Sequence, residues 1–285
     1  DGSRIEAILP PAAPDGPCVS IRRFFKETLT VDRLIRFGAM DTEVASALRA
    51  LVASKLNVLI AGGTGSGKTS MLNALSSYIP EGERVVVIED SREVQLQRTH
   101  VCQLEARPPD PKGRGEVSIR DLFRATLRLR PDRIVVGEIR GGEALDLIQA
   151  MTSGHGGCLS TLHATYPRDT ISRLETMAMM SDIEMPLQAL RIQLASAVNI
   201  IVQVSRLQDG SRKITHISEV LGYDLQTSSY QMHDIYVRLY EGFGPNGEIL
   251  SRLVPSTMPT CLAQLHEHGT DMPPSFYAAL QAQGG

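Results

Sequence analysis

The sequence predicts an α/β fold with a central, mostly parallel sheet. Three runs, at 57–61, 84–91 and 132–140, are apolar and β-branched. Glycines follow the first run, and acidic residues stand near the ends of the other two. Buried strands have this pattern when their carboxyl ends line a ligand site. A helix-period run covers 40–55, directly before the first strand, and another covers 69–78, after it. Strands that alternate with helices in this way favour parallel pairing.

The composition is that of an ordinary soluble protein. The chain has 285 residues, of which 42% are hydrophobic and 21% are charged. No apolar run reaches the roughly 18 residues that span a bilayer, and the four cysteines contain no Cys-x-x-Cys pair, as in a reducing cytosol. We therefore expect a cytoplasmic protein with no direct membrane span. A net charge of −3 gives no general electrostatic reason to expect a nucleic-acid partner.

The beginning of the chain predicts the remnant of an N-terminal domain and a linker. "SRIEAILPP" and "CVSIRRF" predict two strands on either side of a proline- and glycine-rich stretch. Two strands are too few to form a domain, so we interpret residues 1–28 as the tail of a partial α/β domain. Residues 29–222 are then the expected core. Residues 223–285, where the hydrophobic pattern weakens, are the expected C-terminal extension.

The elements of the core follow from capping residues and hydrophobic spacing. Asp41 or Thr42 is positioned to cap the helix at 40–55. Farther along, "SRLETMAMMS" predicts a helix, and "PLQALRIQLASAVNIIVQVSRL" predicts a helix followed by a strand.

Two glycine-containing turns predict hairpins near the end of the chain. Asp209-Gly210 separates two β-rich runs, and Asn246-Gly247 separates two more. Two short helices are then expected in "MPTCLAQLHEHG" and "PPSFYAALQAQ".

A glycine-rich loop follows the strand at 57–61 and satisfies the pattern G-x-x-x-x-G-K-[ST]. Glycines let successive backbone N–H groups turn onto phosphate oxygens, and the N-terminus of the next helix adds partial positive charge. Lys68 is expected at the β- and γ-phosphates, and Thr69 is expected to bind Mg²⁺. The motif predicts an ATP or ADP site built from Gly63, Thr64, Gly65, Ser66, Gly67, Lys68, Thr69 and Ser70.

Acidic residues stand at the ends of two predicted strands. Glu138 is expected to polarise the attacking water, and the alternative is a solvated strand-end carboxylate. Gly137 occupies the position before it, where a Walker B strand usually has aspartate. This difference moves the metal-binding role toward Glu89, Asp90 and ordered water, and for Glu89 we also expect a catalytic role. Asp90 is either a site residue or the cap of the next turn.

His163 ends the apolar run "GCLSTLH", which predicts a buried strand that reaches the same edge of the sheet. It is expected to contact the γ-phosphate or the neighbouring acid, and the alternative is a histidine with a structural role. His155 and His163 do not predict a metal site, because they have no cysteine or carboxylate companions at ligand spacing.

Arginines are dense between the two acidic strands. Arg120, Arg124 and Arg128 are spaced four apart, on one face of a predicted helix. Because like charges so placed repel, we expect an anionic partner, such as phosphates or acids of a neighbouring subunit. The alternative is a solvated basic face. Arg140 directly follows the Glu138 strand and is expected to bind the nucleotide.

Several motifs in this order resemble the type II/type IV secretion ATPase superfamily. Its Walker A, Asp, atypical Walker B and His boxes are similar to "GGTGSGKT", "VIEDSREVQL", "RPDRIVVGEIRGGEALDLIQAMTSGHGGCLSTLHA" and "SRLETM". Within the superfamily, "ARPPDPKGRGEVSIRDLFRATLRLRPDRIVVGEIRGGEA" most resembles the CpaF/TadA-like motors of Tad (Flp) pilus systems. The resemblance extends over nearly the whole chain and is most specific up to residue 222.

This resemblance implies an ATPase that forms a ring of identical subunits, expected to be a hexamer. Nucleotide would lie between a partial N-terminal domain and a RecA-like P-loop NTPase C-terminal domain. Hydrolysis would move pilin or a secreted substrate through an inner-membrane platform protein. The resemblance therefore implies a location at the cytoplasmic face of the inner membrane.

The resemblance also implies roles for individual residues. Glu138 matches the catalytic glutamate, Glu89 belongs to the Asp box and His163 to the His box. In the superfamily, arginines of the N-terminal domain and linker approach the phosphates. The matching positions are Arg4, Arg22 and Arg23.

Two other functions share parts of this pattern. A RecA-like nucleic-acid motor has the same fold, but the net acidity and the lack of aromatic residues around the basic helix argue against a strand-binding groove. A non-hydrolysing, nucleotide-gated scaffold would keep Lys68 and would not need Glu138. A P-loop GTPase is excluded, because the sequence has no guanine-reading N-K-x-D stretch.

Overall fold

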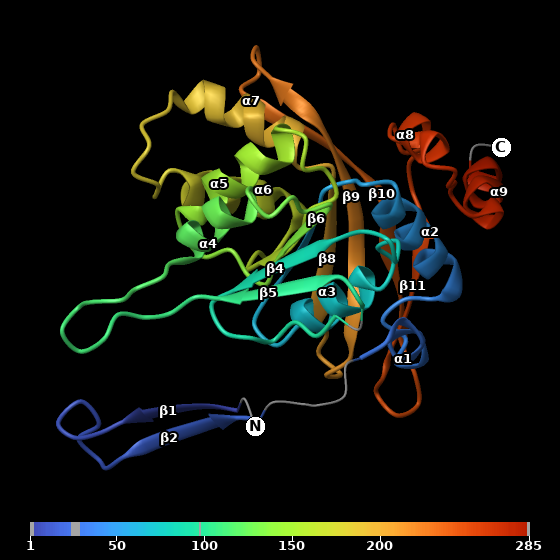
Figure 1. Cartoon of the computed structure of the whole chain (residues 1–285). Helices are drawn as coiled ribbons and strands as arrows, with labels where there is room; N and C mark the ends of the chain where they lie inside the picture. Colours follow the sequence, from blue (N-terminus) through green and yellow to red (C-terminus); the bar gives the residue numbers. More distant parts are fainter. Residues whose placement is uncertain (1–2, 24–28, 97, 284–285) are drawn as a thin grey trace.

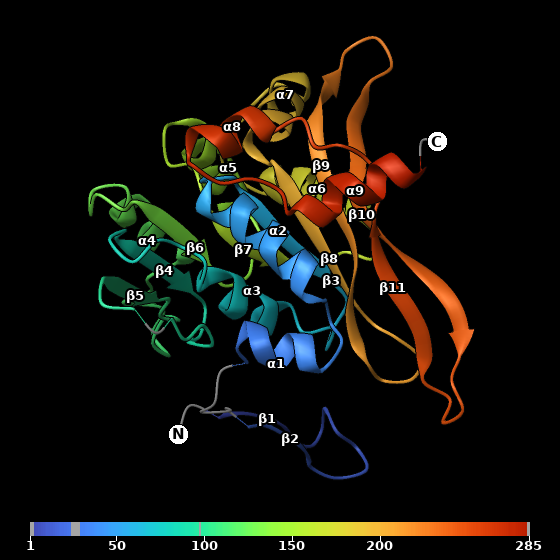
Figure 2. The same cartoon turned by 90° about the vertical axis from the view of Figure 1, so that its right-hand side faces the viewer.

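A nine-stranded sheet forms the centre of the protein over the residues that the structure, a computed structural model, describes: 3–23, 29–96 and 98–283. The parallel strands are β3 (Val58–Gly62), β4 (Val85–Glu89), β5 (Val101–Glu105), β6 (Arg133–Val136), β7 (Leu159–Leu162) and β8 (Ile200–Arg206). The antiparallel strands are β9 (Arg212–Asp224), β10 (Ser229–Phe243) and β11 (Ile249–Pro255). The order across the sheet is β11-β10-β9-β8-β3-β7-β6-β4-β5 (Figures 1 and 2). The predicted α/β fold with a mostly parallel sheet is confirmed.

Helices cover both faces of this sheet (Figures 1 and 2). One hydrophobic core contains residues of α1 (Val31–Arg36), α2 (Thr42–Ala53), α3 (Lys68–Ser76), α8 (Leu262–Glu267) and α9 (Pro274–Gln283). The other contains residues of α4 (Ile119–Thr126), α5 (Glu143–Thr152), α6 (Pro167–Ala178) and α7 (Leu187–Ala197). Strand side chains alternate between the two cores, with Ile60 in the first and Leu59 in the second. Among the helices that the structure describes, none is long and apolar enough to cross a membrane.

Local chemistry explains the helix that precedes the first core strand. Asp41 is the N-cap of α2, and its Oδ1 accepts the backbone N–H of Val44 at 2.8 Å. The apolar residues at helical spacing along α2 are buried in the first core, as the periodicity predicts. The capping residue left open between Asp41 and Thr42 is therefore Asp41.

The N-terminal segment forms a separate two-stranded sheet. β1 (Arg4–Ile8) and β2 (Cys18–Arg22) pair antiparallel, with Arg4 opposite Arg22. Both predicted strands are thus present. All residues of β2 are exposed, and Figures 1 and 2 show the pair lying apart from the main sheet. Such a pair buries too little apolar surface to be a domain by itself.

The C-terminal segment continues the main sheet. β9 runs through residue 222, so the boundary predicted at that position falls inside a strand. β10 and β11 add to the same sheet at its antiparallel end, and α8 and α9 pack on the first core. The turns predicted at Asp209-Gly210 and Asn246-Gly247 join β8 to β9 and β10 to β11. We call β9, β10 and β11 the antiparallel wing.

Candidate nucleotide site

The P-loop connects β3 to α3 and depends on its glycines. Gly65 has a φ of +70° and Gly67, the N-cap of α3, a φ of +95°, which is a left-handed conformation that favours glycine. A Cβ on Gly62 would overlap the Ser66 Oγ and the Val204 carbonyl oxygen. The loop can therefore form only with small residues at these positions, and it brings its backbone N–H groups to the start of α3.

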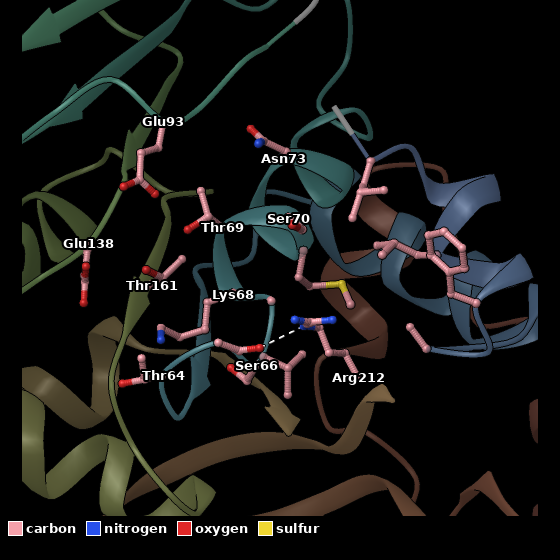
Figure 3. A pocket seen from close by; sticks show the side chains of 18 of the residues that line it. Thr64, Ser66, Lys68, Thr69, Ser70, Asn73, Glu93, Glu138, Thr161 and Arg212 are labelled. Carbon is pink, nitrogen blue, oxygen red and sulfur yellow. Dashed lines mark hydrogen bonds between the residues drawn. The ribbon is translucent and has the colours of Figure 1, made fainter. Parts of the chain in front are cut away.

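A cavity of about 1370 Å³ opens in front of this loop. Figure 3 shows Lys68, Thr69 and Glu138 around it. It is large enough for a nucleoside triphosphate, because ligand pockets usually measure about 300–1,000 Å³. The predicted site residues that line it are Arg22, Arg23, Thr64, Gly65, Ser66, Gly67, Lys68, Thr69, Ser70, Glu138, Arg140 and His163.

Lys68 is the buried cation of the site. Its Nζ donates to the Gly63 carbonyl oxygen at 3.1 Å and lies 3.3 Å from the His163 Nδ1. Burial lowers the pKa of Lys68, although the Glu138 charge acts in the opposite direction. Gly63 itself contributes this carbonyl to the loop and does not line the cavity.

Glu138 lies just after β6, with both carboxylate oxygens in contact with basic side chains. Oε1 lies 2.9 Å from the His163 Nε2, and Oε2 accepts from the Arg140 Nη2 at 2.7 Å. Burial by itself would raise the pKa of Glu138, but the Arg140 hydrogen bond and charge, with His163 and Lys68, bring it below its usual value. Glu138 is therefore a carboxylate at neutral pH.

His163 follows β7 and joins Lys68 to Glu138. Burial and the Lys68 charge lower the pKa of His163, against the effect of Glu138, so the imidazole is neutral near pH 7. An Nε2–H that donates to Glu138 leaves Nδ1 as an acceptor for Lys68. This tautomer satisfies both neighbours of the ring.

Arg140 bridges the two acidic strand ends. Besides Glu138, it contacts Asp90, with Nη1 3.2 Å from Oδ2. The Glu138 hydrogen bond raises the pKa of Arg140. The sequence left Asp90 as either a site residue or a cap. This contact with Arg140 places Asp90 at the edge of the site.

Glu89 does not reach the cavity. It is 4% exposed, and its Oε1 accepts the backbone N–H groups of Glu93 at 2.9 Å and Val94 at 2.7 Å. Burial raises the pKa of Glu89 to about 7, despite these hydrogen bonds. A Cβ on Gly137 would lie 2.9 Å from the Glu89 Cγ, so glycine replaces the usual aspartate because the Glu89 side chain occupies that space. The carboxylate that lines the cavity from this segment is Glu93, which no sequence pattern indicated.

Arginines from the N-terminal sheet reach the same cavity. Arg22 donates from Nη2 to the Glu93 Oε2 at 3.2 Å. Adjacent residues of a strand point to opposite faces, yet Arg22 and Arg23 both line the cavity. β2 ends at Arg22, so strand alternation does not extend to Arg23. The side chain of Arg4 lies outside the part of the chain that the structure describes.

The arginine-rich helix is shorter than predicted. α4 ends at Thr126, so Arg128 lies in the turn that follows and does not share the helical face. Arg120 has its anionic partners within the chain, because it contacts Asp146 at 3.0 Å and Asp182 at 2.8 Å. The expected anion from a neighbouring subunit is therefore not needed to explain Arg120.

No sequence motif indicated the cavity residues that come from the far side of the P-loop. Arg212 and Lys213 at the start of β9 line the cavity, and the Arg212 Nε donates to the Gly65 carbonyl oxygen at 2.8 Å. Apolar side chains, among them Phe37 and Met71, line another part of the cavity. In the sequence, the only signal that Arg212 lies near a sheet edge is the turn predicted at Asp209-Gly210.

A P-loop after a central parallel strand, with a carboxylate just after another parallel strand of the same sheet, defines the class of RecA-like P-loop domains. The chain belongs to the type II/IV secretion system protein family, whose family model matches residues 3–235. This membership confirms the predicted superfamily.

Individual relatives agree with this assignment. Rv3659c of Mycobacterium tuberculosis, whose name assigns it to conjugal transfer, is 39% identical over 215 residues, which are 75% of this chain and 60% of that protein. The conjugal transfer protein TrbB of Rhizobium radiobacter is 34% identical over 234 residues, or 80% of this chain and 69% of TrbB. The crystal structure of the VirB11 ATPase from the Brucella suis type IV secretion system, in complex with sulphate, is similar with a TM-score of 0.55 and 28% identity, over 75% of this chain and 72% of VirB11.

Proposed function

We propose that this chain is the ATP-hydrolysing motor of a type IV-like (Tad/Flp) pilus assembly or type II/IV secretion system. The observation that carries the proposal is the continuous contact from Lys68 through His163 to Glu138 in one cavity. A cation that could bind phosphate lies beside an ionised carboxylate that could act on water, and this supports the proposal. A protein that only binds nucleotide would not need this carboxylate.

The loop fits the phosphates of ATP and a Mg²⁺ ion. The left-handed glycines at Gly65 and Gly67 let the amides from Gly63 to Ser70 turn toward an anion. Lys68, now bonded to a carbonyl oxygen of its own loop, is positioned to move onto a phosphate oxygen. The Thr69 hydroxyl would hold Mg²⁺, which offsets phosphate charge when bound and usually keeps several waters.

Glu138 orients the attacking water and accepts its proton. Its low pKa keeps it ionised at neutral pH, and Arg140 fixes the direction of one of its oxygens. The neutral His163 is placed to contact the γ-phosphate. We propose that Glu89 acts on metal and water indirectly, because it holds the backbone of the segment that brings Glu93 to the cavity.

The N-terminal sheet completes the site. Arg22 and Arg23 line the cavity, and with Arg4 we propose that they close onto the phosphates when ATP binds. The working form is proposed to be a homo-hexamer at the cytoplasmic face of the inner membrane, where it drives a platform protein. The chain spans 60% of the length of Rv3659c. That relative therefore has further sequence outside the matched part.

The test is hydrolysis of Mg-ATP by the purified protein, measured as released phosphate. We expect the activity to rise faster than linearly with protein concentration as rings form. Lys68→Ala should weaken the binding of a fluorescent ATP analogue. Binding without hydrolysis at any concentration would instead support a nucleotide-gated scaffold.

Within this proposal, a Tad pilus is the first candidate for the system that the motor serves, and a conjugal transfer or type IV secretion machine is the second. The names of Rv3659c and TrbB favour it, whereas the motif resemblance favours a Tad pilus. Deletion of the gene in its own organism distinguishes them: loss of surface pili supports the Tad system, and loss of conjugal transfer or secretion with pili intact supports the second.

A further inference from the structure

Arg212 ties the antiparallel wing to the P-loop. It is the first residue of β9, and its Nε donates to the Gly65 carbonyl oxygen at 2.8 Å (Figure 3). Its Cδ would lie 3.3 Å from a Cβ on Gly67. One side chain from the wing thus covers both left-handed glycines of the loop.

This hydrogen bond sets the orientation of a peptide group at the tip of the loop. Gly65 is free to adopt many backbone conformations, so its peptide could turn over if its carbonyl were not held. The C=O and N–H of a trans peptide point in opposite directions. Because Arg212 holds the carbonyl on one side, the Ser66 N–H points to the other, where it donates to the Gly63 carbonyl oxygen at 3.3 Å.

The rest of the guanidinium is available to a ligand. Among the residues that the structure describes, none accepts a hydrogen bond from the Nη1 or Nη2 of Arg212. The side chain is exposed and lines the cavity. A guanidinium with both terminal nitrogens unpaired matches the geometry of phosphate oxygens and can also donate to ribose hydroxyls.

The turn before Arg212 is bonded to the far end of the wing. Asp209 accepts from the Ser211 hydroxyl at 2.6 Å and from the backbone N–H of Ile249, the first residue of β11, at 2.8 Å. The Ser211 and Ile249 hydrogen bonds lower the pKa of Asp209 to about 2. The carboxylate is therefore ionised at neutral pH and holds the two turns together.

We propose that Arg212 is a positioning residue that couples nucleotide binding at the P-loop to the antiparallel wing. It holds the Gly65 peptide through Nε and contacts a phosphate or ribose oxygen of the nucleotide through its terminal nitrogens. Bound nucleotide then immobilises the β8–β9 turn and, through Asp209, the start of β11. This proposal rests on the proposed ATP site.

Nucleotide affinity tests the first half of the proposal. Arg206 is a matched control, because it lies opposite Arg212 in the β8–β9 register, is also exposed and does not line the cavity. In a titration with a fluorescent ATP analogue, Arg212→Ala should bind about tenfold more weakly than wild type, or about 1.4 kcal/mol. Arg206→Ala should bind as wild type, and Arg212→Lys should recover part of the affinity. Wild-type affinity in Arg212→Ala would overturn the proposal, whereas no binding by wild type would overturn the ATP site itself.

Hydrogen exchange of the Ile249 amide tests the coupling. Saturating nucleotide should slow this exchange in wild type and in Arg206→Ala, because the Asp209 bond becomes more persistent. Arg212→Ala needs a higher nucleotide concentration for saturation. At that concentration, nucleotide should not slow the exchange of the Ile249 amide in this variant. Equal slowing in Arg212→Ala would mean that the wing senses nucleotide by another route, and the coupling role of Arg212 would be wrong.

Discussion

The His163 Nε2 lies 2.9 Å from the Glu138 Oε1, so residues from the ends of two neighbouring parallel strands form one unit. β6 and β7 pair directly, and both strands end at the edge where the P-loop begins its turn. The other nitrogen of the same ring lies 3.3 Å from the Lys68 Nζ. The carboxylate, the imidazole and the ammonium group therefore meet beyond the carboxyl ends of three adjacent strands, β6, β7 and β3.

Glu138→Gln should separate binding from hydrolysis. The substitution keeps the shape and hydrogen-bonding ability of the side chain and removes the base, so turnover should fall about a hundredfold or more while ATP still binds. The measurements are phosphate release and a fluorescent-nucleotide titration. Glu105→Gln is the control, since Glu105 ends the parallel strand β5, is exposed and does not line the cavity. Wild-type turnover in Glu138→Gln would refute the catalytic assignment.

Gly137→Ala should destabilise the protein by about 1–3 kcal/mol, because the new Cβ would be forced against the Glu89 side chain. Urea unfolding measures this change. In a double-mutant cycle with Glu89→Ala, the double variant should lose less stability than the sum of the single variants. Gly82→Ala is the control, because no atom lies within 4 Å of the Cβ position at Gly82. Additive losses in the cycle would show that the two residues do not compete for space.

Glu89→Gln should change how stability depends on pH. The folded pKa of Glu89 is raised to about 7 from an ordinary value of 4.5. Folding therefore favours the protonated form, and ionisation of this buried group costs stability as the pH rises from about 4.5 through 7. Glutamine resembles the protonated acid, so the variant should gain on wild type over this range, by up to about 3 kcal/mol at pH 8. Urea unfolding at pH 5, 6, 7 and 8 gives the difference, and a constant difference would contradict the raised pKa.

Arg22→Ala and Arg23→Ala should each weaken ATP binding by about fivefold or more and lower turnover, because both side chains line the cavity and charge-assisted contacts to phosphate are strong. Arg128→Ala is the matched control, since Arg128 is exposed and does not line the cavity. Equilibrium titration and steady-state kinetics give the two effects. If Arg128→Ala abolished turnover and the other two had no effect, closure of the N-terminal sheet onto the phosphates would be wrong.

Local chemistry in the sequence determined most of the fold and the centre of the site. The P-loop needs left-handed glycines at Gly65 and Gly67, and these stand in a fixed pattern before Lys68. The cap at Asp41 and the hairpin turns likewise depend on residues close together in the chain. Apolar runs separated by helices predicted a parallel sheet, whose carboxyl ends meet at one edge. For this reason Glu138 and His163 could be placed beside Lys68 before any contact was known.

Only the tertiary structure decided which side chains of neighbouring segments enter the cavity. Glu89 and Glu93 belong to one acidic segment. The Glu89 side chain packs against Gly137 and is buried, whereas Glu93 lines the cavity. Arg120 forms ion pairs with acids on α5 and in the loop after α6. Arg212 contacts the P-loop because β9 pairs with β8. These contacts join residues far apart in the chain, and they depend on strand order and on the space left between packed side chains. A hydrophobic pattern specifies which residues are buried, but it does not specify which distant residue fills the space beside them.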